Sequence, residues 1–254
     1  MMGRDDPEPG PDLTAGTAHV WLARRHDASA RHAGLLDETE QARWAAYRRD
    51  EDRQRFLAGC ALAKIAIAQY TGQRPAQVRF ARTCRRCGKS HGKPAIEGGG
   101  LEHSVTHSGD LVAVAVARVP VGLDLEQLDG RLQRLGGHGD VDGLADLVLA
   151  DVERAALAAV PPAGRAREFL VAWTRKEAVT KATGDGLRVA FSDVIVAADA
   201  GPPRLVSWPY HRSPRDVSLF DLDLDAGYVA ALAVLGRCEE VLVEDGSALL
   251  AGVP

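Results

Sequence analysis

The segment WTRKEAVTK at residues 173–181 has the 3.6-residue periodicity of a helix, and VGLDLE at residues 121–126 alternates like a β-strand. The strand directs Asp124 and Glu126 to one face, beside a glycine that leaves room for a ligand. The helix carries Glu177. Because hard divalent cations prefer oxygen ligands, we expect the two segments to place three carboxylates around one metal ion.

Simpler interpretations exist for each segment taken alone. Asp124 and Glu126 are compatible with the solvated face of an ordinary strand. Glu177 and Lys181 are one helical turn apart, which is compatible with an exposed ion pair worth about 0.2–0.5 kcal/mol. The combination of both segments in one chain favours a functional site.

The two segments resemble the signature motifs of the Sfp-type 4′-phosphopantetheinyl transferases, (V/I)-G-(I/V)-D-x-E and (F/W)-(S/C/T)-x-K-E-(A/S)-x-x-K. The single departure is Leu123 in the first motif. Three further segments resemble this family in the expected order: DRQRFLAG at 52–59, GKP at 92–94 and SVTHSG at 104–109, where Ser104 and Thr106 replace the usual Asn and Ser.

The resemblance implies an α+β fold of two similar halves in one chain, with the active site in the cleft between them. We expect a disordered tail at residues 1–16, a coenzyme A-gripping half at 17–118, and a metal-binding, catalytic half at 119–254. An internal similarity supports the duplication, since GDLVAVAV at 109–116 resembles GYVAALAV at 227–234.

The implied activity is transfer of 4′-phosphopantetheine from coenzyme A to a serine of an apo acyl or peptidyl carrier protein, which depends on Mg²⁺ and releases adenosine 3′,5′-bisphosphate. Mn²⁺ suits the same oxygen ligands. Two alternatives remain: another Mg²⁺-dependent enzyme acting on pyrophosphates, and a non-catalytic module that binds nucleotides or zinc. A dependence on carrier protein would separate the first alternative from the transferase.

The resemblance also implies roles for individual residues. Asp124, Glu126 and Glu177 are the expected metal ligands, and Lys181 is expected to face the α-phosphate as a catalytic residue. The phosphates of coenzyme A are assigned to four residues: Arg55, Lys93, Thr106 and His107. An ordinary loop histidine is the alternative for His107.

The general base is less defined. Glu153 matches the acidic residue at the start of a helix in the family and is the candidate to deprotonate the carrier serine. In the alternative interpretation, Glu153 is a first-turn acid that interacts with the helix dipole, and Asp151 caps the same helix.

Composition is that of an ordinary globular enzyme. The 254-residue chain has a net charge of −4, which argues against nucleic acid as a partner. The polar, Pro-rich first twelve residues do not resemble a signal peptide, and the apolar runs are too short to span a bilayer. We therefore expect a cytoplasmic protein without a membrane partner and, from the family, a monomer.

The stretch from Arg74 to Lys93 contains seven Lys or Arg residues and no acidic residue. It predicts either a solvated loop or a surface that binds phosphate or an acidic partner. Cys84, Cys87 and His91 in this stretch have spacing compatible with zinc, although a closed site needs a fourth ligand. Reduced cysteines in a basic turn are the favoured interpretation.

Periodicity and turn residues predict the remaining elements. A long helix is expected at 38–70 and a glycine-rich loop at 130–143. The other helices are expected at 144–149, 151–160 and 166–183, and the strands at 18–23, 111–118, 121–126, 191–197, 204–208, 217–224 and 228–235.

Overall fold

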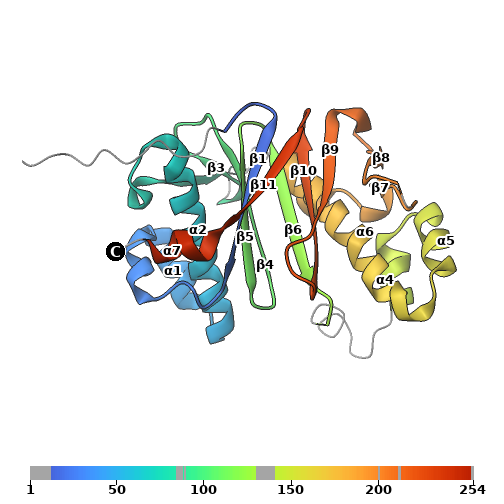
Figure 1. Cartoon of the computed structure of the whole chain (residues 1–254), viewed down its shortest axis with the longest axis horizontal. Coiled ribbons are helices and arrows are strands. Elements are labelled where there is room, and N and C mark those ends of the chain that lie inside the picture. Colours follow the sequence, from blue (N-terminus) through green and yellow to red (C-terminus); the bar gives the residue numbers. More distant parts are fainter. Residues whose placement is uncertain are drawn as a thin grey trace, which may run out of the picture.

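The computed structural model describes residues 13–83, 88, 90–129, 141–199, 201–210 and 213–252. Two β-sheets face one another, and each is covered on its outer side by a long helix (Figure 1). The order of layers is therefore helix, sheet, sheet, helix. This arrangement confirms the predicted α+β class.

The N-terminal sheet has the strand order β11-β1-β5-β4. Its strands are β1 (Thr17–Arg24), β4 (Glu102–Ser108), β5 (Leu111–Ala117) and β11 (Glu240–Asp245). Helix α2 (Asp50–Thr71) covers it. Strand β5 is buried throughout, because alternate side chains pack under α2 and between the two sheets.

The C-terminal sheet has the strand order β6-β10-β9. Its strands are β6 (Val121–Gln127), β9 (Val217–Leu222) and β10 (Tyr228–Leu235). Helix α6 (Pro162–Thr183) covers it. Apolar residues of β6 and β10 pack between the sheets, and Ala231 and Ala233 of β10 pack under α6.

Shorter elements surround these two layers. They are α1 (Glu38–Ala46), β2 (Phe80–Thr83), β3 (Ser90–Ile96), α4 (Val141–Val148), α5 (Asp151–Ala159), β7 (Ile195–Val196), β8 (Leu205–Ser207) and α7 (Gly246–Ala251). Short 3₁₀ helices lie at Ala30–Leu35, Pro75–Gln77, Gly186–Arg188, Phe191–Asp193 and Pro214–Asp216.

The two halves resemble each other in detail. Helices α2 and α6 are both 22 residues long, and each ends at a glycine in the left-handed region, Gly72 with φ 65° and Gly184 with φ 75°. Such a C-cap satisfies the last carbonyl groups of a helix without a Cβ clash. The similar sequences at 109–116 and 227–234 form β5 and β10, the central strands of the two sheets.

Several predicted elements differ from the structure. The helix expected at 38–70 is two helices, because Asp37 and Glu40 form a capping box that begins α1, and a new acidic first turn begins α2 at Asp50. The segment 104–109, for which no strand was predicted, mostly belongs to strand β4. Helix α6 begins at Pro162 rather than 166, since proline is tolerated in a first turn.

The C-terminal segment returns to the N-terminal half. Strand β11 pairs in parallel with β1, and α7 packs against α2. The buried His32 contacts the carbonyl of Leu250 through Nε2 at 3.1 Å. The division expected after residue 118 does not anticipate this return, because the segment EVLVED at 240–245 is short and has only three apolar residues, flanked by acidic ones.

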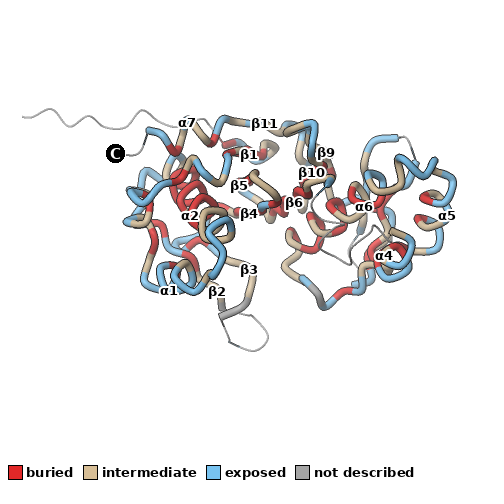
Figure 2. Tube along the Cα trace, turned by 90° about the horizontal axis from the view of Figure 1, so that it is seen from below, coloured by how far each residue is buried: buried red, intermediate tan, exposed pale blue. Residues whose placement is uncertain are grey.

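Figure 2 shows that the buried residues concentrate in α2, α6 and the strands between them. In the part of the chain that the structure describes, no helix is long and apolar enough to cross a membrane. Residues 1–12 of the expected tail and 130–140 of the expected loop lie outside that part.

Gly122 allows α6 to approach β6 closely. A Cβ atom at this position would lie 2.0 Å from the carbonyl oxygen of Ala178 and 2.4 Å from the backbone nitrogen of Ala182. The expectation that this glycine leaves room for a ligand is therefore wrong, because the helix backbone fills the space.

We predict that Gly122→Ala lowers the free energy of unfolding by about 3 kcal/mol, at the upper end of the range for overpacked cores, because the clashing atoms are backbone. Urea unfolding followed by circular dichroism measures this. Gly34→Ala is the control, since nothing lies within 4 Å of a Cβ there. Equal unfolding midpoints for both variants would contradict the close approach.

Candidate functional site

Strand β6 lies alongside β4, although the two strands belong to different sheets. Side-chain hydroxyl groups of β4 accept hydrogen bonds from the backbone N–H groups of β6. They take the role that backbone carbonyl groups of a neighbouring strand have in an ordinary sheet. The pairs are Leu123 N to Ser104 Oγ at 3.0 Å, Leu125 N to Thr106 Oγ1 at 3.4 Å and Gln127 N to Ser108 Oγ at 3.1 Å. All three pairs are 19 residues apart in the sequence, so the strands run parallel in one register.

Lysine side chains bind carbonyl groups of β6. Lys93 Nζ donates to Val121 O at 3.1 Å, and Lys181 Nζ donates to Leu123 O at 3.1 Å. Lys93 also donates to Ala182 O at 3.2 Å and so ties β6 to the end of α6. Hydroxyl and ammonium groups together satisfy backbone groups that an edge strand would otherwise leave open.

Asp124 and Glu126 lie on this edge and are each 5% exposed. Thr106 Oγ1 donates to Asp124 Oδ1 at 3.2 Å, and Ser108 Oγ donates to Glu126 Oε2 at 2.8 Å. Lys181 Nζ also binds Asp124 Oδ1, at 2.6 Å. Among the described residues, nothing donates a hydrogen bond to the buried Oδ2 of Asp124. Its lone pairs are therefore available to a cation.

Glu177 lies one turn before Lys181 on α6 and is partly exposed. Helix α6 packs on β6 and runs in the opposite direction (Figure 1). Four helical residues advance about 6 Å, close to the length of two strand residues. Because Lys181 contacts Asp124, Glu177 lies about one turn away from that contact, on the helix that packs along β6.

The acidic residues do not form a closed metal cage by themselves. Within the described ranges, no group of three or more His, Cys, Asp or Glu side chains is arranged to hold a metal ion. Mg²⁺, however, usually takes one or two protein carboxylates and completes its shell with water and substrate phosphates. Asp124 and Glu126, with one unpaired buried oxygen, fit that kind of site. The structure thus assembles two of the three expected carboxylates.

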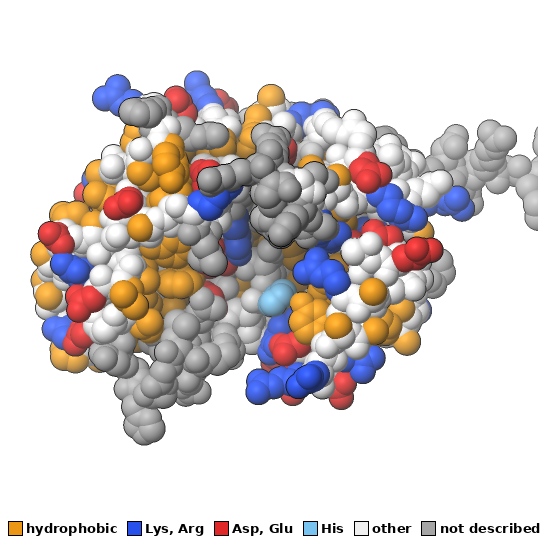
Figure 3. Space-filling model, turned by 180° about the vertical axis from the view of Figure 1, so that it is seen from behind, with side chains coloured by type: hydrophobic (Ala, Val, Ile, Leu, Met, Phe, Trp, Pro, Cys, Tyr) orange, Lys and Arg blue, Asp and Glu red, His pale blue; other side chains and the backbone are white. Residues whose placement is uncertain are grey.

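Positive side chains lie near the carboxylates. Figure 3 shows a histidine with Lys and Arg side chains in the hollow between the two halves. Arg55 Nε donates to Gly109 O at 2.7 Å, and its Nη1 pairs with Asp52 at 2.6 Å. His107 is exposed, yet its pKa is lowered by partial desolvation first and then by the charge of Arg55, with a smaller contribution from Lys181. His107 is therefore largely neutral near pH 7.

Glu153 does not lie in this cluster. Its Oε2 accepts from Ala150 N at 2.8 Å and pairs with Lys176, and its Oε1 accepts from Val196 N at 2.9 Å. Lys176 and Lys181 are five residues apart, or about 140° around the helix, so they point to different sides of α6. The structure thus supports the helix-start interpretation of Glu153, although Ala150 rather than Asp151 is the N-cap.

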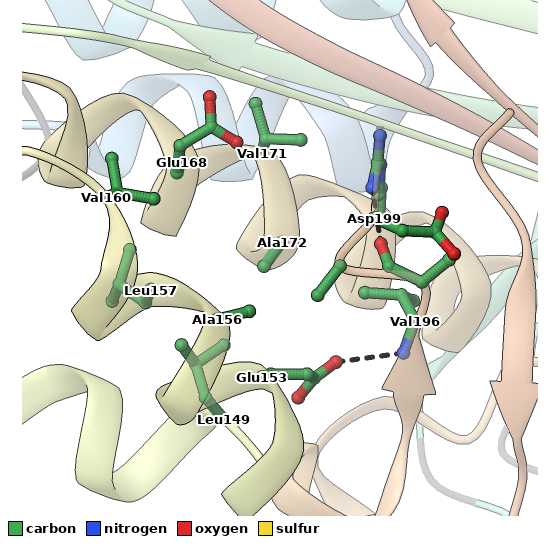
Figure 4. Close-up of a pocket in the computed structure, with 13 residues that line it drawn as sticks. Leu149, Glu153, Ala156, Leu157, Val160, Glu168, Val171, Ala172, Val196 and Asp199 are labelled. Atoms are coloured by element: carbon green, nitrogen blue, oxygen red, sulfur yellow. Dashed lines mark hydrogen bonds between the residues drawn. The ribbon is translucent and has the colours of Figure 1, made fainter. Parts of the chain in front are cut away.

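The surroundings of Glu153 form a small pocket between α5, α6 and β7, with a volume of about 100 Å³ (Figure 4). Burial lowers the pKa of Lys176, although the carboxylate of Glu153 opposes this shift. Lys176 also donates to Val148 O and Phe191 O. These contacts describe a structural ion pair rather than a group that reaches a substrate.

The contact between β4 and β6 is called the junction below. Two of its hydroxyl residues were not among the predicted site residues. Ser104 and Ser108 lie inside the segment that resembles the family, but only their pairing with β6 shows what they do. The detectable signal is the alternation of hydroxyl side chains at every second residue of 104–108, which directs them to one face of a strand. Cys84 and Cys87 lie outside the described residues, as does the His91 side chain.

Comparisons with known proteins identify the family of the chain. A sequence profile of the 4′-phosphopantetheinyl transferase superfamily matches residues 120–233. The chain is 30% identical over 240 residues to the 4′-phosphopantetheinyl transferase HetI of Nostoc sp., covering 91% of this chain and 93% of that protein. It is 24% identical over 201 residues to a 4′-phosphopantetheinyl transferase of Bacillus subtilis, covering 79% and 83% of the two proteins.

Among solved structures, the holo-[acyl-carrier-protein] synthase of Thermotoga maritima matches with a TM-score of 0.36 and 24% identity, over 47% of this chain and 64% of that chain. The sequence matches define an enzyme of the transferase class. The chain belongs to the 4′-phosphopantetheinyl transferase superfamily. The predicted family is thereby confirmed.

We predict that Glu153→Gln lowers the free energy of unfolding by about 3 kcal/mol, because it leaves the ammonium of Lys176 buried without its counter-charge. Urea unfolding measures the effect. Asp151→Asn is the control at the same helix start, since its pair with Arg154 is exposed. If Glu153→Gln instead keeps the stability of wild type but loses turnover, the result supports a role for Glu153 as the base.

His103 predicts a pH dependence of stability. Burial first, and then the charges of Lys93 and Arg82, lower its pKa from 6.5 to about 3. The unfolded chain therefore binds the proton more readily, so stability falls as the pH drops below 6.5. From about pH 7.5 to about pH 5, we expect wild type to lose about 2 kcal/mol more than His103→Phe does. If urea unfolding shows that wild type and His103→Phe lose the same free energy of unfolding over this pH range, the prediction is wrong.

Proposed function

We propose that this enzyme transfers the 4′-phosphopantetheine group of coenzyme A to a serine of an apo acyl or peptidyl carrier protein, with Mg²⁺, and releases adenosine 3′,5′-bisphosphate. One observation carries the proposal: a buried carboxylate oxygen of Asp124 without a donor, next to Glu126 and Lys181 at the junction of the halves. Membership of the superfamily supports the same reaction.

In this proposal Asp124, Glu126 and Glu177 hold the metal ion, which when bound neutralises charge on the pyrophosphate. Lys181 binds Asp124, and its ammonium is suited to the phosphate that becomes the leaving group. Its three donors allow it to keep the Leu123 carbonyl while it turns toward a phosphate oxygen.

Arg55 and His107 are the proposed contacts of the coenzyme A phosphates. They lie on the N-terminal side of the hollow, where an anion would favour protonation of His107 and so oppose its lowered pKa. Lys93 and Thr106 already bind protein groups of the junction. We therefore propose that these two mainly position the site rather than grip the phosphates.

The geometry does not favour Glu153 as the general base, since Oε2 pairs with Lys176 and Oε1 accepts from Val196 N, on another side of α6 from Lys181. A carboxylate or a water held near Asp124 and Glu126 is closer to the place where a carrier serine would attack. We propose that deprotonation takes place there.

The decisive experiment incubates the protein with coenzyme A, MgCl₂ and an apo carrier domain and measures the mass of the carrier. We expect the carrier to gain one phosphopantetheine group, and the gain to disappear with EDTA or with a carrier whose serine is replaced by alanine. If several different apo carrier domains gain no mass under these conditions, the proposed function is wrong.

We predict that Glu177→Ala reduces transfer by more than about 100-fold, beyond the loss typical of groups that only orient a ligand, while the fold is retained because the side chain is partly exposed. Initial rates from the mass assay test this. Glu168→Ala is the matched control, an exposed glutamate of the same helix. Wild-type rates for Glu177→Ala would exclude its role as a ligand.

A further inference from the structure

The three hydroxyl groups of β4 follow a single rule of register. Each accepts the N–H of the β6 residue 19 positions later, and two of them also donate to the carboxylate 18 positions later. Thr106 meets Asp124 in this way, and Ser108 meets Glu126. Ser104 has no such partner, because the corresponding residue is Gly122.

The backbone contact decides what each hydroxyl proton can do. A hydroxyl group has one proton and two lone pairs. Because Ser108 Oγ accepts the N–H of Gln127, its proton is directed away from that nitrogen and toward Glu126 Oε2 at 2.8 Å. The sheet junction thereby fixes the direction of the donor, and the donor fixes one oxygen of the carboxylate.

We infer that Ser108 and Thr106 are positioning residues that orient Glu126 and Asp124 for the divalent cation. Carboxylates that bind cations are commonly held by such hydrogen bonds. Thr106 binds only Oδ1 of Asp124, on the same side as Lys181, and leaves Oδ2 without a donor in the described part of the chain. The inference rests on the proposed function, since it needs a cation at these carboxylates.

A comparison of Ser108 with Ser104 separates a role in positioning the carboxylate from a purely structural role. Ser104 and Ser108 are both buried serines of the same strand, and each accepts one N–H of β6 at 3.0–3.1 Å. Among the described residues, a carboxylate accepts a hydrogen bond from Ser108 but not from Ser104. Removing either hydroxyl costs the junction one backbone contact, but only the loss of Ser108 also removes a hydrogen-bond donor from Glu126.

The test measures binding of Mn²⁺ alone, without coenzyme A or carrier, from the electron paramagnetic resonance signal of the free ion. We expect Ser108→Ala to weaken Mn²⁺ binding about 10–100-fold, the range typical of residues that orient metal ligands. Thr106→Val should act in the same direction, and Ser108→Thr should restore binding. Ser104→Ala should stay within about threefold of wild type, since it leaves both carboxylates held.

The outcomes separate the two proposals. If wild type binds Mn²⁺ and Ser108→Ala and Ser104→Ala bind it equally well, the positioning role is wrong while the metal site stands. If both variants weaken binding to the same extent, the hydroxyl groups serve the junction only. If wild type binds no Mn²⁺ but modifies carriers in the mass assay, the positioning inference is wrong, whereas the proposed transferase activity still stands. Failure of both assays removes the proposed function itself.

Discussion

The edge of β6 that has no neighbouring strand in its own sheet is the constraint on which this structure depends. A strand edge presents N–H and C=O groups that must be satisfied, and burial between two halves removes water as a partner. Here side chains replace the neighbouring strand: hydroxyl groups of β4 accept the N–H groups, and Lys93 and Lys181 donate to carbonyls. The two sheets are thereby joined without merging into one.

The same atoms that close this edge form the candidate site. Lys181 binds a β6 carbonyl and Asp124, and Thr106 binds a β6 N–H and Asp124. The alignment of the two halves and the orientation of the carboxylates are therefore one structural property. A change that shifts β4 against β6 moves the hydroxyl donors and the acidic residues out of register together.

Much of the fold follows from local sequence. The alternation in 121–126 predicted β6, and the continuous apolar run at 228–235 predicted β10, because β6 has an apolar face between the sheets and β10 is apolar on both faces. The family motifs identified Asp124, Glu126 and Lys181, which the structure brings together. By contrast, β4 was not predicted as a strand, because its inward residues are hydroxyl groups whose partners lie 18 and 19 residues away.

Other features depended on contacts that no local pattern encodes. Glu153 was a plausible base until its buried partner Lys176 became visible, and the two lie 23 residues apart. Gly122 was interpreted as open space, although the backbone of α6 occupies it. The C-terminal strand was missed because β11 is stabilised mainly by pairing with β1, at the far end of the sequence.

The return of the C-terminus has a mechanical consequence. The chain passes between the halves twice, at 118–120 and at 236–239, and the two crossings are adjacent because Leu235 N donates to Pro120 O at 2.8 Å. Two neighbouring covalent links at one end resist sliding of one half past the other. Glu126 and Ser108 are at the opposite ends of their strands from these links, so at the acidic residues the halves are aligned by side-chain contacts and not by the chain itself.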